Sequence, residues 1–167
     1  DQPVTLQEEN PGRASDLAML IFTSGTTGLP KAARITNKRW AVAALGSAAG
    51  CRLMPSDTAY CCLPLHHSTG MLVAVGGALV GGARLVLASK FSVSTFWDDI
   101  RRDGVTVVFY VGELCRYLLR SEPAPAEDRH PVRLFVGNGL RPHIWKRLME
   151  RFGPLRVLEF YGSTEGN

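Results

Sequence analysis

The stretch from Thr23 to Lys31 combines residue types that can hold a chain of phosphate groups. It reads Thr23-Ser24-Gly25-Thr26-Thr27-Gly28-Leu29-Pro30-Lys31 and directly follows an apolar run. Glycines let a backbone approach an anion closely, hydroxyl groups donate hydrogen bonds to its oxygens, and a lysine offsets negative charge that remains. This composition predicts a polyphosphate-binding loop and makes ATP the first ligand to consider.

The spacing within this loop argues against the Walker A loop of P-loop NTPases. A Walker A loop needs two glycines with four residues between them, followed at once by lysine and then by serine or threonine. Here Gly25 and Gly28 enclose only two residues, Pro30 precedes the lysine, and Ala32 takes the place of the metal-binding hydroxyl. A plain turn between two strands remains the other interpretation, which the clustered hydroxyls and the terminal lysine disfavour.

A second polar stretch, Tyr161-Gly162-Ser163-Thr164-Glu165, also follows a strand-like run. A tyrosine ring can stack on a purine, a threonine can bond phosphate oxygens, and a glutamate can hold Mg²⁺. Ligands of α/β sheets gather at the carboxyl ends of the strands. We therefore expect the two polar loops to face one crevice, although some 130 residues separate them.

Apolar runs of strand length alternate with segments of helical pattern from residue 17 onward. This alternation predicts an α/β fold with largely parallel sheets flanked by helices. The expected strands are Leu17–Phe22, Ala32–Ile35, Thr58–Leu63, Arg84–Leu87, Val105–Tyr110, Arg133–Val136 and Val157–Phe160.

Helix signals occur between these strands. A helix capped by Ser92 or Ser94 is expected to run through Arg102 and to end at Gly104, and a second is expected from Pro142 to Gly153. Trp145 and Met149 in the second helix are expected to pack in the core.

Three further segments were assigned from their composition. The segment 71–88 is apolar, but four glycines and Arg84 interrupt it, so a buried helix followed by a buried strand is expected rather than a membrane span. The proline-rich segment 121–131 is expected to be a solvent-exposed loop, and residues 1–16 are a polar lead-in without the pattern of a secretory leader.

Composition limits the classes of function. The 167 residues are 46% hydrophobic, enough for one domain with a substantial core, and the formal charge of +4 is spread along the chain. No basic block points to nucleic acid, so none is expected as a partner. Cys51, Cys61, Cys62 and Cys115 lack metal-site or disulfide spacing and are expected to be free, buried thiols in a reducing compartment, with Cys61 and Cys62 on opposite faces of a strand.

The two polar loops resemble the phosphate loop and the Y-G-x-T-E motif of the adenylate-forming, or AMP-binding, superfamily. Further stretches are similar to its fatty acid transport protein and very-long-chain acyl-CoA synthetase branch. These are Lys90-Phe91-Ser92 with Phe96-Trp97, Gly112 to Leu118, Gly137-Asn138-Gly139-Leu140-Arg141, and Tyr161 to Asn167. The resemblance runs from about residue 17 to the end and implies part of the large N-terminal domain of an adenylate-forming enzyme.

The resemblance implies a two-step reaction with ATP, Mg²⁺ and coenzyme A. A fatty acid carboxylate attacks the α-phosphorus of ATP to give an acyl-adenylate and pyrophosphate, and coenzyme A then displaces AMP to give a thioester. Such chemistry depends on positioning and on neutralising negative charge. Lys31, Thr164 and Glu165 would act in catalysis, and Thr23 and Glu165 would hold Mg²⁺.

The remaining roles follow from the same resemblance. His67 would lie by the acyl pocket, although a histidine at a surface or a helix end is an equally simple reading. ATP or AMP would contact the residues of three stretches, which are Thr23, Ser24, Gly25, Thr26, Thr27, Gly28 and Lys31; Gly137, Asn138 and Gly139; and Tyr161, Gly162, Ser163 and Thr164. From the residues alone, Gly137 to Gly139 could equally be an ordinary strand-to-helix turn.

The segment 17–167 is expected to be a partial AMP-binding domain. The family's ribose-binding aspartate, hinge, C-terminal domain and catalytic lysine would lie past Asn167, so the chain alone is expected to bind ATP or AMP weakly and to turn over poorly. The parent protein is expected in the cytoplasm, with peripheral membrane association left open. Two alternatives are a fatty-acid uptake protein that uses the adenylate site for trapping and, less favoured, a P-loop NTPase. A Cys115–Glu113 nucleophile and base is disfavoured because no histidine lies nearby in the sequence.

Overall fold

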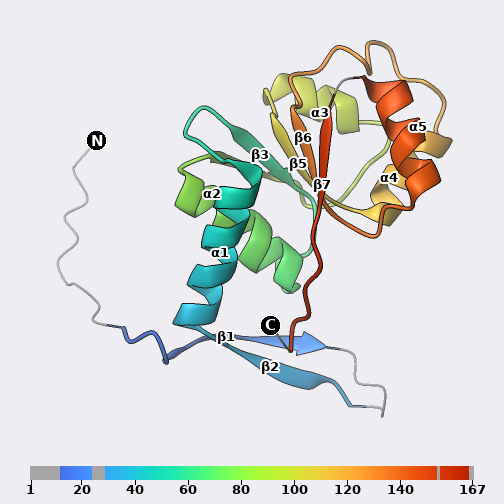
Figure 1. The fold of residues 1–167 in the computed structure, drawn as a ribbon. Coiled ribbons are helices and arrows are strands. Elements are labelled where there is room, and N and C mark those ends of the chain that lie inside the picture. The colour runs from blue at the N-terminus through green and yellow to red at the C-terminus, as the bar shows by residue number, and fades with distance from the viewer. Residues whose placement is uncertain (1–11, 24–28, 154, 166–167) are drawn as a thin grey trace.

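A computed structural model describes residues 12–23, 29–153 and 155–165. Its centre is a parallel sheet of five strands in the order β4-β3-β5-β6-β7. The strands are β3 (Thr58–Cys61), β4 (Arg84–Leu87), β5 (Val107–Val111), β6 (Leu134–Asn138) and β7 (Arg156–Glu159). Helices cover both faces, which gives three layers and confirms the predicted α/β class (Figure 1).

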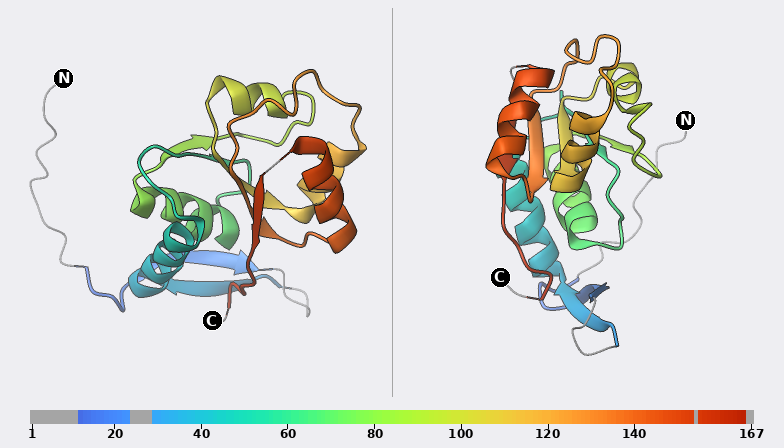
Figure 2. Two further views of the ribbon diagram at one scale, coloured as in Figure 1. Left: turned by 45° about the horizontal axis from the view of Figure 1, so that its top comes forward. Right: turned by 90° about the vertical axis from the view of Figure 1, so that its right-hand side faces the viewer.

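The first two strands form a separate unit. β1 (Leu17–Thr23) and β2 (Lys31–Thr36) pair antiparallel in a two-stranded sheet of their own, with Thr23 opposite Lys31. The first polar loop therefore leaves an antiparallel hairpin and not a strand of the parallel sheet, while the expectation of largely parallel sheets holds for the other five strands. Figure 2 shows the hairpin below the five-stranded sheet, at the end of α1 (Asn37–Cys51).

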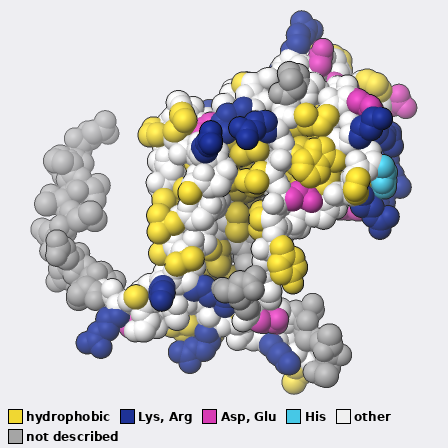
Figure 3. Space-filling model, in the orientation of Figure 1, with side chains coloured by type: hydrophobic (Ala, Val, Ile, Leu, Met, Phe, Trp, Pro, Cys, Tyr) yellow, Lys and Arg dark blue, Asp and Glu magenta, His cyan; other side chains and the backbone are white. Residues whose placement is uncertain are grey.

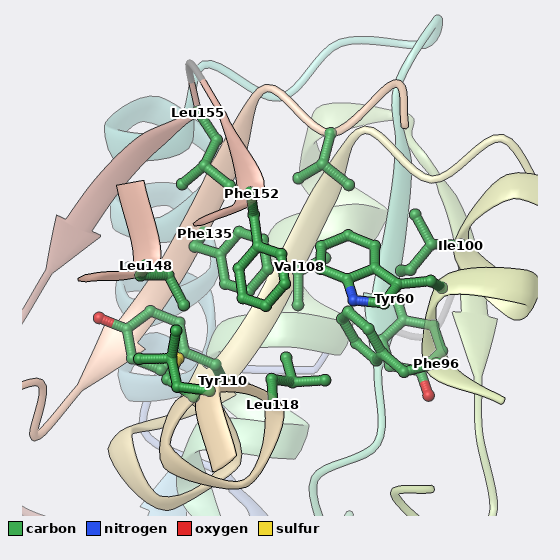
Figure 4. Packing of buried hydrophobic residues seen from close by; sticks show 14 of the residues in the cluster. Tyr60, Phe96, Ile100, Val108, Tyr110, Leu118, Phe135, Leu148, Phe152 and Leu155 are labelled. Carbon is green, nitrogen blue, oxygen red and sulfur yellow. The ribbon is translucent and has the colours of Figure 1, made fainter. Parts of the chain in front are cut away.

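One face of the large sheet carries most of the aromatic core. It is covered by α3 (Phe96–Arg102), α4 (Gly112–Arg120) and α5 (Pro142–Phe152). Tyr60, Phe135 and Phe152 are almost completely buried there and lie among leucine and valine side chains (Figure 4). Burial of such large apolar side chains is worth about 1.5–3 kcal/mol each, so this face holds the sheet against its helices. Trp145 and Met149 pack against the same cluster, as predicted.

The opposite face is packed with smaller residues. It is covered by α1, by the π-helical segment η1 (Thr69–Val75) and by α2 (Gly76–Gly81), which continues η1. Glycines let α1 and α2 approach closely, because a Cβ atom on Gly76 would lie 2.8 Å from the Ala44 Cβ atom. Ile21 and Ile35 of the hairpin pack with Leu72 of η1 in a third cluster. The hairpin is thereby joined to the helices rather than to the large sheet.

Several predicted elements need correction. The α3 helix begins after Thr95, whereas the Ser92 and Ser94 hydroxyls bond each other at 3.1 Å, so neither caps it. The helix in segment 71–88 is confirmed, but β4 is only half-buried because it is the edge strand of the sheet. The strand pattern alone does not distinguish an edge from a central position.

The segment 121–131 is not wholly a solvent-exposed loop. Glu127 within it is 8% exposed and forms an ion pair with Arg151 of α5 at 2.7 Å. The Arg151 guanidinium is the main reason that the pKa of this carboxyl lies below its usual value. The pair anchors the loop to the helix.

The four cysteines are free thiols, as predicted, and Cys51, Cys61 and Cys115 are buried. Cys61 packs in the cluster under α1, whereas Cys62 packs against the aromatic cluster on the other side of the sheet. Adjacent residues of an extended chain point to opposite faces, which explains this division.

Candidate nucleotide-binding site

The ends of the hairpin strands meet the second polar stretch. The Thr23 hydroxyl donates a 2.6 Å hydrogen bond to Glu165 Oε1, and the Lys31 carbonyl oxygen lies 3.4 Å from the same hydroxyl. Strand pairing places Lys31 opposite Thr23, so three of the expected phosphate and metal residues lie together. The loop residues Ser24, Gly25, Thr26, Thr27 and Gly28 lie outside the described residues.

Two further contacts hold the stretch from Tyr161 to Glu165. Arg39, in the first turn of α1, donates from Nη2 to the Ser163 carbonyl oxygen at 3.1 Å. The Ser68 and Thr164 hydroxyls share a hydrogen bond of 3.0 Å. The stretch is thus fixed by β1, by α1 and by the segment that leads into η1. The roles of Arg39 and Ser68 could not be predicted from the sequence, since neither residue belongs to a motif that signals ligand binding.

A cavity of about 950 Å³ opens beside these contacts. Its polar end lies where Arg39 and Ser68 bond the stretch from Tyr161 to Glu165. Lys38, His67 and Asn138 also line the cavity, whereas Thr23, Lys31 and Glu165 do not. The rest runs between α1 and η1 and is largely apolar. Its apolar and small lining residues are Val42, Ala43, Gly46, Ser47, Gly50, Cys51, Leu72, Val73, Val136, Leu158 and Phe160. Figure 3 shows apolar side chains between α1 and the segment that leads to the C-terminus.

The shape and lining of this cavity fit an amphipathic ligand. Small-molecule sites are commonly apolar clefts of about 300–1,000 Å³ with a few polar groups that fix orientation. The polar end could take a nucleotide or a carboxylate, and the apolar part could take a hydrocarbon chain. Gly46 lines the cavity, and a Cβ atom built on it would have no other atom within 4 Å. The cavity is therefore open next to this residue.

Of the three residues Gly137 to Gly139, only Asn138 lines the cavity. Gly137 lies within β6, where a Cβ atom would sit 2.1 Å from the Tyr110 carbonyl oxygen. Gly139 has a φ of +79°, a conformation that favours glycine, and its carbonyl oxygen would lie 2.1 Å from a Cβ atom on Gly112. Close packing explains Gly137 and the positive φ explains Gly139, in both cases without a ligand.

Glu159 supports this turn from the end of β7. Its Oε1 atom accepts hydrogen bonds from the Tyr110 hydroxyl at 2.9 Å and from the Leu140 backbone N–H at 2.7 Å. Burial and the hydrogen bond to Glu159 raise the pKa of Tyr110, so the phenol stays protonated and donates. Glu159 therefore ties the turn at Asn138 to the strand that carries Tyr161, a role that the sequence did not reveal.

The Tyr161 side chain is 89% exposed, and Gly162 has no atom within 4 Å of a Cβ position. The tyrosine ring is thus free to stack on a planar ligand at the cavity entrance. His67 also lines the cavity, and its Nδ1 atom accepts from the Thr69 backbone N–H at 3.3 Å. That bond leaves Nε2 of the neutral ring as the donor.

Cys115 is unsuited to nucleophilic catalysis. Its side chain is completely buried, and burial raises its pKa to about 12. The thiolate is the reactive form of cysteine, so this thiol is inert at neutral pH.

A Mg²⁺ ion would find oxygen ligands at the hairpin end. Among the described residues, no group of three or more histidine, cysteine, aspartate or glutamate side chains is placed to share a metal. Mg²⁺ commonly takes one or two carboxylates together with water and substrate phosphates, and Glu165 beside the Thr23 hydroxyl fits that pattern.

Comparison with known proteins assigns the family. The family described as "AMP-binding enzyme" matches residues 1–167, which is the whole chain. The chain belongs to the AMP-binding enzyme family. The long-chain fatty acid transport protein 3 of Mus musculus is 50% identical over 167 residues, covering 100% of this chain and 25% of that protein.

Two further similarities extend the comparison within the AMP-binding family. The medium/long-chain-fatty-acid–CoA ligase FadD6 of Mycobacterium tuberculosis is 48% identical, over 98% of this chain and 28% of that protein. The crystal structure of ATP-bound MatB from Rhodopseudomonas palustris superposes with a TM-score of 0.81 at 30% identity, over 92% of this chain and 30% of that one. The chain thus spans about a quarter of the length of the curated relatives that it matches.

Within the part of the chain that the structure describes, none of the helices has both the length and the apolar character needed to cross a bilayer.

Proposed function

We propose that the protein to which this chain belongs activates a long- or very-long-chain fatty acid with ATP and transfers it to coenzyme A. The observation that carries the proposal is the contact of Thr23 with Glu165 beside a cavity that is polar at one end and apolar along α1. The residues proposed to hold phosphate would then lie next to a hydrocarbon-sized channel, since Glu165 directly follows Thr164, which lines the cavity. The names of the relatives, a fatty acid transport protein and a fatty acid–CoA ligase, support the same substrate class.

Each residue of the proposed site would have a separate role in the reaction. Lys31 and the loop 23–28 would hold the β- and γ-phosphates, and their positive charge and hydrogen bonds would favour departure of pyrophosphate. Glu165 with Thr23 would hold Mg²⁺, which supplies further neutralisation of phosphate charge. Thr164 would contact the α-phosphate or the attacking carboxylate, Tyr161 and Asn138 would contact adenine, and His67 would lie near the acyl carboxylate.

The test is product analysis with the longer protein that contains this chain. ATP, a long-chain fatty acid and coenzyme A should yield acyl-CoA, AMP and pyrophosphate, and the substitutions Lys31→Ala and Glu165→Ala should each abolish most of this activity. Turnover of ATP to ADP without AMP would refute the proposal and revive the P-loop NTPase. The chain of residues 1–167 alone should bind nucleotide weakly and form no acyl-CoA at an appreciable rate.

A second candidate function is fatty-acid uptake, which the name of the mouse relative favours. The adenylate site would then trap fatty acid that has entered at a membrane. Uptake by cells that express Lys31→Ala separates the two functions. Loss of both uptake and acyl-CoA formation would tie uptake to ligation, whereas uptake that survives without ligation would show an independent transport activity.

A further inference from the structure

A hollow of about 340 Å³ lies between α4 and α5, apart from the nucleotide cavity. Four arginines and a histidine line it, together with two apolar residues. They are Arg116, Arg120, Arg141, His143 and Arg147, with Leu119 and Ile144. None of these lining residues is acidic, and the hollow shares no residue with the nucleotide cavity. Figure 3 shows dark blue side chains and a histidine gathered along the edge formed by these helices.

The arginines of this hollow are largely without counter-charges. Arg116 forms an exposed ion pair with Glu113 at 3.0 Å. For Arg120, Arg141 and Arg147, no salt bridge is present among the described residues. On the neighbouring α3 helix, by contrast, both arginines pair with aspartates one helical turn away. The arginines that lack a salt bridge repel one another, and a bound anion would relieve this repulsion.

The chemistry of the lining indicates which anion fits. Arginine presents a planar fork of N–H donors that matches phosphate oxygens, and four arginines line this hollow. Leu119 and Ile144, which also line the hollow, are 6% and 8% exposed and give it an apolar part. A ligand with a phosphate group and a less polar organic part would satisfy both, and the hollow is near the lower size limit of small-molecule sites of about 300 Å³.

We propose that this hollow binds the phosphate group of an organic phosphate, outside the nucleotide cavity. Arg141 and Arg147 contact the phosphate oxygens, and Leu119 and Ile144 contact the organic part. Arg141 follows Asn138 by one short turn, so the hollow and the nucleotide cavity lie on the two sides of the turn that Glu159 holds. Two kinds of molecule have a phosphate group attached to an organic part, namely a soluble phosphomonoester and an anionic phospholipid with its headgroup.

The test compares two variants with the same loss of charge. The hollow variant carries Arg141→Gln and Arg147→Gln. The control carries Arg129→Gln and Arg156→Gln, two exposed arginines that do not line the hollow, of which Arg156 starts β7 at the opposite end of the sheet. Circular dichroism verifies that both variants fold like the original chain. The soluble probe is adenosine 3′,5′-bisphosphate, measured by calorimetry, and the lipid probe is phosphatidylcholine vesicles with and without phosphatidic acid, measured by co-sedimentation.

The hollow variant should bind at least one probe at least about tenfold more weakly than the original chain, because it loses two charged donors to the phosphate group. The control should stay within about twofold. If the hollow variant loses affinity for the bisphosphate, the ligand is a soluble phosphate. If it loses affinity only for vesicles that contain phosphatidic acid, the ligand is a lipid headgroup. The proposal is wrong if neither probe binds the original chain at a probe concentration of about 1 mM. It is also wrong if the hollow variant and the control lose affinity by the same factor. Lys31→Ala should retain binding to the hollow, so failure of the ligase proposal would leave this result unchanged.

Discussion

The Thr23 hydroxyl lies 2.6 Å from a carboxylate oxygen of Glu165, although 142 positions separate the two residues in the chain. One residue ends a hairpin strand and the other follows the last strand of the large sheet. Their contact joins the hairpin, at the end of β1, to the segment that follows the large sheet. The site is therefore formed at a junction rather than within one sheet.

Removal of the Glu165 charge should weaken binding of magnesium-bound ATP. Glu165→Gln keeps an oxygen that can accept the Thr23 hydrogen bond but loses the charge that Mg²⁺ prefers. We expect about tenfold weaker calorimetric affinity for ATP with Mg²⁺, and little change for AMP without metal. Thr23→Ser, which retains the hydroxyl, serves as the control. Equal losses for both nucleotides would argue against a metal role for Glu165.

Ser68→Ala should loosen the stretch that carries Thr164. The variant removes the 3.0 Å hydrogen bond between the two hydroxyls, a contact worth about 1 kcal/mol. AMP affinity should therefore fall about fivefold. Ser94→Ala, which removes a similar bond between exposed serines away from the cavity, should leave affinity unchanged. An unchanged affinity in Ser68→Ala would show that the Arg39 and Thr23 contacts suffice to position the stretch.

The ion pair of Asp57 with Arg133 predicts a pH-dependent stability. Asp57 is buried, and hydrogen bonds from Arg133, then Thr106, hold its pKa below the usual value despite the opposing effect of burial. A carboxyl whose folded pKa is lowered stabilises the fold above its unfolded pKa of about 3.9, and this contribution is lost as the pH falls toward the folded value.

Arg133→Met removes this contribution. It leaves a buried carboxylate without its partner, so we expect the free energy of unfolding at pH 7 to fall by about 3 kcal/mol. Urea titrations should show that the difference from the original chain shrinks below about pH 4. Glu127 titrates in both proteins and cancels in the difference. A difference that stays constant down to pH 2 would contradict the assignment to Asp57.

Two glycines, one in α1 and one at the start of α2, should respond oppositely to substitution by alanine. Gly46 has no atom within 4 Å of a Cβ position, and Gly46→Ala should stabilise α1 by about 0.5–1 kcal/mol. Gly76→Ala would place a methyl group 2.8 Å from the Ala44 Cβ atom and should destabilise the fold by about 1–3 kcal/mol. Thermal unfolding monitored by circular dichroism measures both, and a loss of stability in both variants would refute the open channel at Gly46.

The strands were predictable because each forms a short apolar run between turn residues, and all seven exist within a few positions of the expected bounds. The pairing of the strands was not predictable, since the apolar pattern of β1 and β2 is the same whether these strands join a parallel sheet or form a hairpin. Pairing depends on tertiary contacts such as Ile21 and Ile35 with Leu72.

The site was predictable only where its residues form motifs. Thr23, Lys31 and Glu165 stand in recognisable stretches and lie together in the structure. Arg39 and Ser68 contact the same stretch, but an arginine in a first helical turn and a serine in a loop are common anywhere. Their role depends on which segments meet in space, and a single sequence does not contain that information directly.

The junction of Thr23 with Glu165 also sets an order of events during protein synthesis. Thr23 leaves the ribosome before Glu165 and cannot reach this partner until about 140 further residues have been added. At roughly 5–20 residues per second, that delay is about 7–30 s. During this interval the hairpin exists without the contact that completes it, so a nascent chain should acquire nucleotide affinity only near the end of this segment's translation.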